Sequence, residues 1–167
     1  MTELFRCGHF VVRPITEHNI ESTLKVYQQS EDFLSLGPNP QASIQMVYSD
    51  MECSERAKGL FCGIWNISGT HLGILDFVPE IREKTAFVTL LMIARPYRNR
   101  GIGADIVTAL CQYLVASRAI KTIESTVQIN NERGIKFWKK CGFHMSEQAE
   151  PQADGTTTFR LRLELPV

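Results

Sequence analysis

Residues 90 to 104 read Leu90-Leu-Met-Ile-Ala-Arg-Pro-Tyr-Arg-Asn-Arg-Gly-Ile-Gly-Ala104, an apolar run followed by a loop rich in arginine and glycine. The apolar run begins at Ala86, and its length and β-branched content predict a central buried strand over 86–93. Helical spacing of apolar residues predicts a helix over 104–117. A glycine loop that opens a helix directs free N–H groups at an anion, so phosphate is the favoured ligand. Solvated arginines on an ordinary connection would give the same pattern.

Two common phosphate loops can be excluded by their spacing. A Walker A loop ends in Gly-Lys-Ser/Thr, whereas this loop ends in Gly-Ile-Gly-Ala. The dinucleotide fingerprint needs a third glycine at position 106, which is Ile106 here. The pattern that remains is Arg98-x-x-Gly101-x-Gly103 after an apolar strand.

A second motif follows on a predicted helix, Asn131-Glu-Arg-Gly-Ile-Lys-Phe-Trp-Lys-Lys-Cys-Gly-Phe143. Together the two motifs resemble the GNAT superfamily of N-acetyltransferases. Its loop is Arg/Gln-x-x-Gly-x-Gly/Ala, and its helix is Asn-x-x-Ala-x-x-Phe-Tyr-x-Lys-x-Gly-Phe. The helix matches at the Asn, Phe, Lys, Gly and Phe positions, and Gly134 stands where a small residue is expected. Trp138 takes the place of the family's tyrosine.

The rest of the chain predicts further strands and helices without repeats or linkers, so we expect one domain over residues 1–167. Pro79 is expected to end one strand, Gly142 to close the last helix, and Asp154-Gly155 to form a turn. The predicted strands cover 10–15, 60–67, 72–78, 86–93, 122–127, a segment opening at Phe143, and 156–165, and the predicted helices cover 16–27, 42–51, 104–117 and 131–140.

This order predicts a mixed α+β sheet with helices on its faces. The resemblance implies more: a mostly antiparallel GNAT-like sheet of about six to seven strands, in which two central strands splay apart. Ile93 and its neighbours would then open a slot beside residues 126–130.

The resemblance implies acetyl-CoA as the acyl donor. Backbone amides from Arg98 to Ala104 would cradle the pyrophosphate, the backbone from Leu91 to Ile93 would pair with the pantetheine amides, and Asn131 would bind the same arm. The lysines at 136 and 140 could reach the adenosine phosphates or could simply be solvated. The full set expected to bind the cofactor is Leu91, Met92, Ile93, Arg98, Asn99, Arg100, Gly101, Ile102, Gly103, Ala104, Asn131, Phe137, Trp138 and Lys140.

Catalysis needs an oxyanion contact, which the backbone N–H of Leu91 or Met92 would supply. It also involves departure of the coenzyme A thiolate. The indole of Trp138 can donate a hydrogen bond but cannot act as a general acid near neutral pH, so positioning or packing is its expected role. Tyr97 and Tyr113 could by residue type replace the family's tyrosine as proton donor to the thiolate, and we expect neither to be essential.

The general base is less defined by the sequence. The strand over 86–93 carries no acid, which leaves Asp76, Glu124 or a water chain to solvent, and we favour the water chain. The acceptor pocket is expected between the first two helices, the loop over 79–85 and the last hairpin. The pair Glu31-Asp32 could meet a cationic acceptor or could be a solvated helix end.

The function expected from these residues is transfer of an acetyl group from acetyl-CoA to a primary amine of a small molecule or protein, by direct attack in a ternary complex. Two alternatives stay open. One is a non-catalytic acyl-CoA-binding regulatory module, favoured by Trp138 and by the acid-free central strand. The other is a nucleotide-binding protein that uses the arginine loop differently.

Composition also limits the kinds of binding partner and the compartment that the sequence favours. The 18 Lys+Arg balance 18 Asp+Glu, which disfavours non-specific nucleic-acid binding. Positive charge nevertheless gathers over 95–100 and 133–140, segments that flank the expected cofactor site. Apolar runs are shorter than the roughly 20 residues that cross a bilayer, and we expect no signal peptide. Five scattered cysteines favour free thiols in the cytoplasm. The histidines lack metal-ligand spacing, and an exposed edge in the last hairpin would allow a homodimer.

Overall fold

One mixed sheet forms the centre of the computed structural model, which describes residues 2–166. In that part of the chain the sheet has nine strands in the order β1-β2-β3-β4-β5-β6-β9-β7, with β8 paired to β9. The strands are β1 (Phe5–Cys7), β2 (Phe10–Pro14), β3 (Leu60–Asn66), β4 (His71–Arg82), β5 (Thr85–Ile93), β6 (Thr122–Gln128), β7 (His144–Met145), β8 (Glu150–Pro151) and β9 (Thr157–Glu164).

Seven helical segments accompany the sheet in the described residues: η1 (Glu17–Asn19), α1 (Ile20–Gln28), α2 (Glu31–Leu34), α3 (Ile44–Arg56), η2 (Arg95–Tyr97), α4 (Ile102–Arg118) and α5 (Glu132–Lys140). Two buried clusters mark the two faces. Residues of α4 and α5 such as Leu110 and Trp138 belong to one cluster, and residues of α1 and α3 such as Val26 and Val47 belong to the other. None of the described helices is long and apolar enough to span a bilayer.

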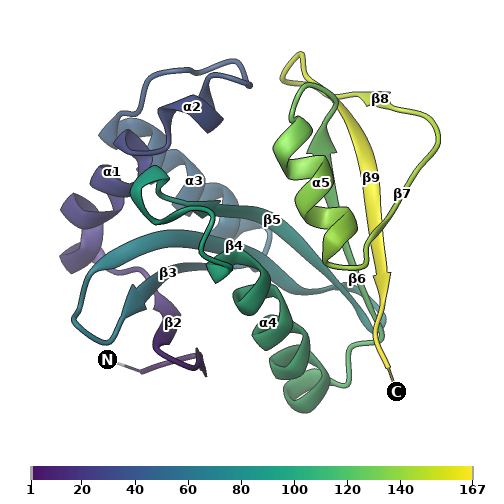
Figure 1. Ribbon diagram of the computed structural model, residues 1–167, viewed down its shortest axis with the longest axis horizontal. Coiled ribbons are helices and arrows are strands. Elements are labelled where there is room, and N and C mark those ends of the chain that lie inside the picture. The colour runs from purple at the N-terminus through teal and green to yellow at the C-terminus, as the bar shows by residue number, and fades with distance from the viewer. Residues whose placement is uncertain (1, 167) are drawn as a thin grey trace.

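Strands β5 and β6 form the parallel pair of this otherwise antiparallel sheet, and they pair over only part of their length. Their register joins Thr85–Val88 to Thr122–Ser125. Beyond that point they diverge, and in Figure 1 the two strands meet near the C-terminus and open towards α2 and α5. The predicted mixed α+β sheet with a splayed central pair is therefore confirmed, with nine described strands where six to seven were expected.

Most predicted elements lie within a few residues of the observed ones. The sequence did not predict β1, α2 or β8, which have three, four and two residues. Elements this short carry too few residues to display a period. Gly142 has φ +95°, as a helix-closing glycine requires.

One expectation was wrong. Pro79 does not end its strand, because the pairing of β4 with β5 is irregular between Val78 and Arg82 and a proline there need not donate a ladder hydrogen bond. In the last hairpin, β9 pairs with β6 on one side and with the short strands β7 and β8 on the other, and β7 is the last strand in the sheet order. The homodimer through the edge of this hairpin stays a prediction.

Candidate active site

A cleft of about 900 Å³ lies where β5 and β6 separate. One wall is β5 from Thr89 to Ile93, and the other is β6 from Ser125 to Gln128. Its mouth is bordered by the segment that follows α1 and by the turn before β9. Of the expected acceptor elements, the second helix and the last hairpin line the cleft, the first helix contributes no residue to its lining, and the segment over 79–85 lies at the opposite, paired end of the sheet.

The edge of β5 that faces the cleft has unused backbone groups. Ala94 N–H donates to Leu72 O across the β4 side at 2.8 Å, so in an antiparallel ladder the groups of Met92 also face β4. The N–H groups of Leu91 and Ile93 point the other way, towards the cleft. Of the two N–H groups predicted to contact an oxyanion, that of Leu91 is thus placed for it, and that of Met92 is directed into the ladder.

A β-bulge sets this arrangement. Leu90 pairs with Asp76 and Val88 pairs with Phe77, so Thr89 is an extra residue on β5. The extra residue of a bulge shifts the alternation, so the side chains beyond it exchange faces of the sheet. Accordingly Ala86 and Val88 pack in the cluster of α4, and beyond the bulge Leu91 and Ile93 pack against that same cluster. The strand was predicted to be buried throughout, but Thr89 is exposed and Leu90 and Leu91 are half-buried, because this part of β5 borders the cleft.

Arg98 ties the glycine loop to β5 and to α2. Its Nε donates to Ile93 O at 2.7 Å, and its guanidinium forms an ion pair with Asp32 on α2. Burial alone would raise the pKa of Asp32, but the hydrogen bond and charge of Arg98 outweigh it and lower that pKa. Arg133 on α5 also lies 3.8 Å from Asp32. Asp32 is therefore neutralised by two arginines, which argues against its suggested role as an acceptor contact.

The loop itself has the geometry of an anion site. Asn99 and Gly101 adopt left-handed conformations, with φ of +63° and +77°, and α4 begins directly after them at Ile102. The first N–H groups of α4 have no partner within the helix, and its dipole adds positive potential there. Asn99 and Ile102 line the cleft, whereas Arg100, Gly101, Gly103 and Ala104 are not part of its lining.

Gly103 has a second reason to be glycine. A Cβ there would lie 3.0 Å from Phe137 Cε1, so the absence of a side chain lets α5 pack close to the start of α4. Phe137 in turn lines the cleft. The second glycine of the loop motif thus serves contact between two helices.

On α5 the predicted residues fall into two groups. Asn131 lines the cleft and caps the helix, its Oδ1 accepting from Gly134 N–H at 2.9 Å. Arg133 also lines the cleft, a residue that the motif alone did not single out. Lys136 and Lys140 are exposed or lie outside the cleft lining, so the expected cofactor contact of Lys140 gains no support.

The two acids proposed as general bases, Asp76 and Glu124, are engaged in contacts outside the cleft. Asp76 is buried, accepts from Ser54 Oγ at 2.7 Å and does not line the cleft. Burial raises its pKa to about 6, despite the Ser54 hydrogen bond and helped by the charge of Asp50. Glu124 forms ion pairs with Arg82 and Arg162.

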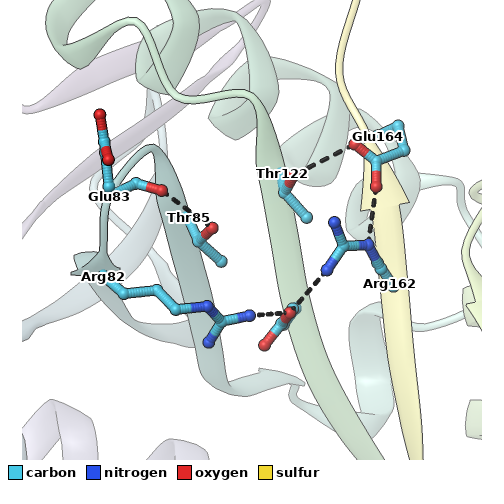
Figure 2. Close-up of polar contacts among 7 residues, drawn as sticks. Arg82, Glu83, Thr85, Thr122, Arg162 and Glu164 are labelled. Carbon is cyan, nitrogen blue, oxygen red and sulfur yellow. Dashed lines mark hydrogen bonds and ion pairs between the residues drawn. The ribbon is translucent and has the colours of Figure 1, made fainter.

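The network around Glu124 lies at the paired end of β5 and β6 (Figure 2). Arg162 bonds Glu124 at 3.0 Å and Glu164 at 2.7 Å, and Glu164 accepts from Thr122 at 3.1 Å. These contacts join β4, β6 and β9 at the end of the sheet that does not open. Glu124 is therefore a sheet-linking residue remote from the cleft.

A model of the acetyltransferase (GNAT) family matches residues 21–143, well over half of the chain. The chain belongs to this family. The resemblance inferred from the two motifs is thereby confirmed, and with it the prediction of an acetyltransferase at the level of the family. No curated protein sequence matches the chain.

Solved structures of acetyltransferases share the fold across the full length. RimL, a ribosomal L7/L12 alpha-N-protein acetyltransferase in complex with coenzyme A, is 13% identical with a TM-score of 0.79, covering 98% of each chain. An acetyltransferase from Thermus thermophilus is 17% identical with a TM-score of 0.74, covering 98% of this chain and 100% of its own. Spermidine N-acetyltransferase from Vibrio cholerae, in complex with CoA and spermine, is 11% identical with a TM-score of 0.70, covering 94% and 96%.

This GNAT chain departs from the family at the tyrosine position. Trp138 is 7% exposed and packs edge-on against Phe143 at a centroid distance of 4.9 Å, so it joins the core while bordering the cleft. Of the two substitutes, Tyr113 stacks on Phe5 at 5.2 Å and lies outside the cleft lining. Tyr97 does line the cleft.

Among the acidic residues of the cleft lining, Asp50 received no role in the sequence analysis. Asp50 on α3 lines the cleft, and its Oδ2 accepts from Tyr27 Oη at 2.6 Å. The available signal was its spacing from Met46, four residues earlier on the same helix face, which also lines the cleft. No group of His, Cys, Asp and Glu suited to a metal ion occurs among the described residues.

Proposed function

We propose that this protein is an acetyl-CoA-dependent N-acetyltransferase that acts on a primary amine of a small molecule or protein. One observation carries the proposal: the cleft between β5 and β6 offers the unused N–H groups of Leu91 and Ile93 along one wall and the start of α4 at its end. An extended amide chain fits the first feature and a pyrophosphate fits the second.

In this proposal, the Leu91 carbonyl and the Ile93 N–H pair with the pantetheine arm as an added strand would, which leaves the Leu91 N–H for the thioester. The Ile93 carbonyl is already occupied by Arg98, so pairing ends there and the arm turns towards the loop. Asn131 keeps its amide N–H₂ for the arm because only its oxygen caps α5. The N–H groups after Gly101 receive the pyrophosphate, with Arg100 supplying positive charge.

Acetyl-CoA supplies an activated acetyl group whose thioester carbonyl the amine attacks. The chain's contribution is to donate the Leu91 N–H to the carbonyl oxygen and to hold both reactants in one cleft. The cleft is open to solvent at its mouth, so the proton released by the amine leaves through water. The thiolate departs without an essential side-chain donor: Trp138 is packed in the core, Tyr113 lies elsewhere, and Tyr97, which does line the cleft, packs against both buried clusters.

The experiment is thiol release from acetyl-CoA over a panel of alkylamines, amino acids and peptides, with mass spectrometry of the product. We expect release that depends on an amine and a product heavier by one acetyl group. Tight coenzyme A binding by calorimetry with no turnover on any acceptor would instead establish the acyl-CoA-binding module, which Trp138 and the acid-free β5 favour.

We further propose that residues 1–167 act as one domain, because the structural matches run through nearly the whole chain. The cytoplasm is the proposed location, because five cysteines are free among the described residues and a reducing compartment keeps thiols in that state.

A further inference from the structure

Asp50 presents a carboxylate to the cleft that no cation among the described residues neutralises. Tyr27 Oη donates to its Oδ2, and Oδ1 has no hydrogen-bond partner in the same part of the chain. The ion pairs on this side of the molecule do not include Asp50. The other acid in the cleft lining near α2, Asp32, differs because Arg98 and Arg133 pair with it.

The surroundings of Asp50 are apolar. Phe33, Leu34, Met46 and Leu90 line the same side of the cleft and pack against the cluster that includes Tyr27 and Met92. Burial raises the pKa of Asp50 from its ordinary value, against the effect of the Tyr27 hydrogen bond. A half-buried carboxylate in such a place is stabilised when a cation joins it.

The helix places Asp50 beside the reacting strand. Met46, Asp50 and Ser54 are spaced four residues apart and share one face of α3. Ser54 donates a hydrogen bond to Asp76, and Asp76 is the β4 residue that pairs with Leu90 on β5. Asp50 precedes Ser54 by four residues, so it lies about one helical turn along α3 from the position opposite Leu90. Asp50 therefore lines the same cleft as the part of β5 where the Leu91 N–H is offered.

We propose that Asp50 binds the cationic nitrogen of the acceptor, and that the acceptor is an alkylammonium compound with no carboxylate next to the amine. This inference rests on the proposed function of the cleft. The apolar side chains suit an alkyl stem. A neighbouring carboxylate on the acceptor would have no partner there, because the arginines of the cleft lining are engaged with Asp32.

Tyr27 is a positioning residue in this scheme. Its side chain is fully buried, and its hydroxyl fixes one oxygen of Asp50 so that the other remains for the ligand. Burial raises the pKa of Tyr27, the charge and hydrogen bond of Asp50 raise it further, and the charge of Asp76 adds to this, so the hydroxyl stays a donor.

The test is calorimetric titration of pentylamine into the coenzyme A-bound protein, beside norleucine, which has the same stem and amine plus a carboxylate. We expect wild type to bind pentylamine more tightly than norleucine. Asp50→Asn should weaken pentylamine binding about thirtyfold or more, because one partner of a desolvated charge pair is lost. Glu52→Gln, an exposed acid on the same helix, is the matched control and should bind as wild type does.

Coenzyme A affinity and thermal unfolding report whether Asp50→Asn is folded. If it is not, Tyr27→Phe decides, with an expected loss of about tenfold from removing a hydrogen bond to a charged group. The inference is overturned if wild type fails to bind pentylamine, prefers norleucine, or binds pentylamine equally with and without the Asp50 carboxylate. Because binding is measured without acetyl transfer, a protein that binds pentylamine through Asp50 but transfers no acetyl group contradicts the proposed function alone.

Discussion

At the scale of single residues, Arg98 connects three parts of the site. It holds the carbonyl of Ile93 at the end of β5, pairs with Asp32 on α2, and begins the turn that leads into α4. The loop motif predicted a residue that helps to bind phosphate. The structure shows in addition that this arginine joins the β5 wall of the cleft to α2 at its mouth.

The buried acid Asp76 gives a prediction about pH and stability. Its pKa is about 6 in the folded protein against an ordinary 3.8, so folding takes up a proton and stability falls as pH rises between these values. Asp76→Asn removes this dependence while its side-chain oxygen can still accept from Ser54. The free energy of unfolding of the variant, minus that of wild type, should rise by about 2.5 kcal/mol from about pH 4 to about pH 7.

Denaturant unfolding at several pH values measures this difference, with Glu52→Gln as the control that should show none. Burial lowers the pKa of His71 to about 4, and this acts in the opposite direction, with stability lost as pH falls from 6.5. His71 is present in every protein compared, so its contribution cancels. A difference for Asp76→Asn that stays flat across the range would contradict the assignment.

At the scale of elements, the close approach of β4 to β5 holds the cleft edge in place. Gly73 on β4 pairs with Ile93, and a Cβ added there would lie 2.6 Å from Met92 O. That atom belongs to the backbone and cannot rotate away. The strand carrying Leu91 and Ile93 therefore depends on the absence of a side chain at residue 73.

Gly73→Ala should accordingly lower the free energy of unfolding by about 1–3 kcal/mol, the usual cost of overpacking, and weaken coenzyme A binding by displacing β5. Gly37→Ala is the control for stability, because its added methyl would meet atoms no nearer than 3.5 Å. Chemical denaturation and calorimetry measure the two effects. Unchanged stability in Gly73→Ala would show that β4 and β5 can separate without cost.

At the scale of the whole molecule, the sequence predicts what is encoded locally. The motifs at 98–104 and 131–143 lie on one loop and one helix, and periodicity located most long elements. It did not predict which distant residues meet. Asp50 reaches the cleft only because α3 packs beside β3 and β4, and the commitment of Glu124 to Arg82 and Arg162 depends on three strands coming together. Contacts between residues that are far apart in the chain leave no periodic pattern in the sequence.

The central claim is that acetyl-CoA binds along the open edge of β5. Amide hydrogen exchange of the β5 backbone, followed by NMR with and without coenzyme A or acetyl-CoA, tests it most directly. We predict that the Ile93 amide exchanges more slowly with either ligand and the Leu91 amide more slowly with acetyl-CoA, while Met92, already directed into the ladder with β4, is unchanged. Saturating acetyl-CoA that leaves the Leu91 and Ile93 amides exchanging at their original rates would contradict the claim.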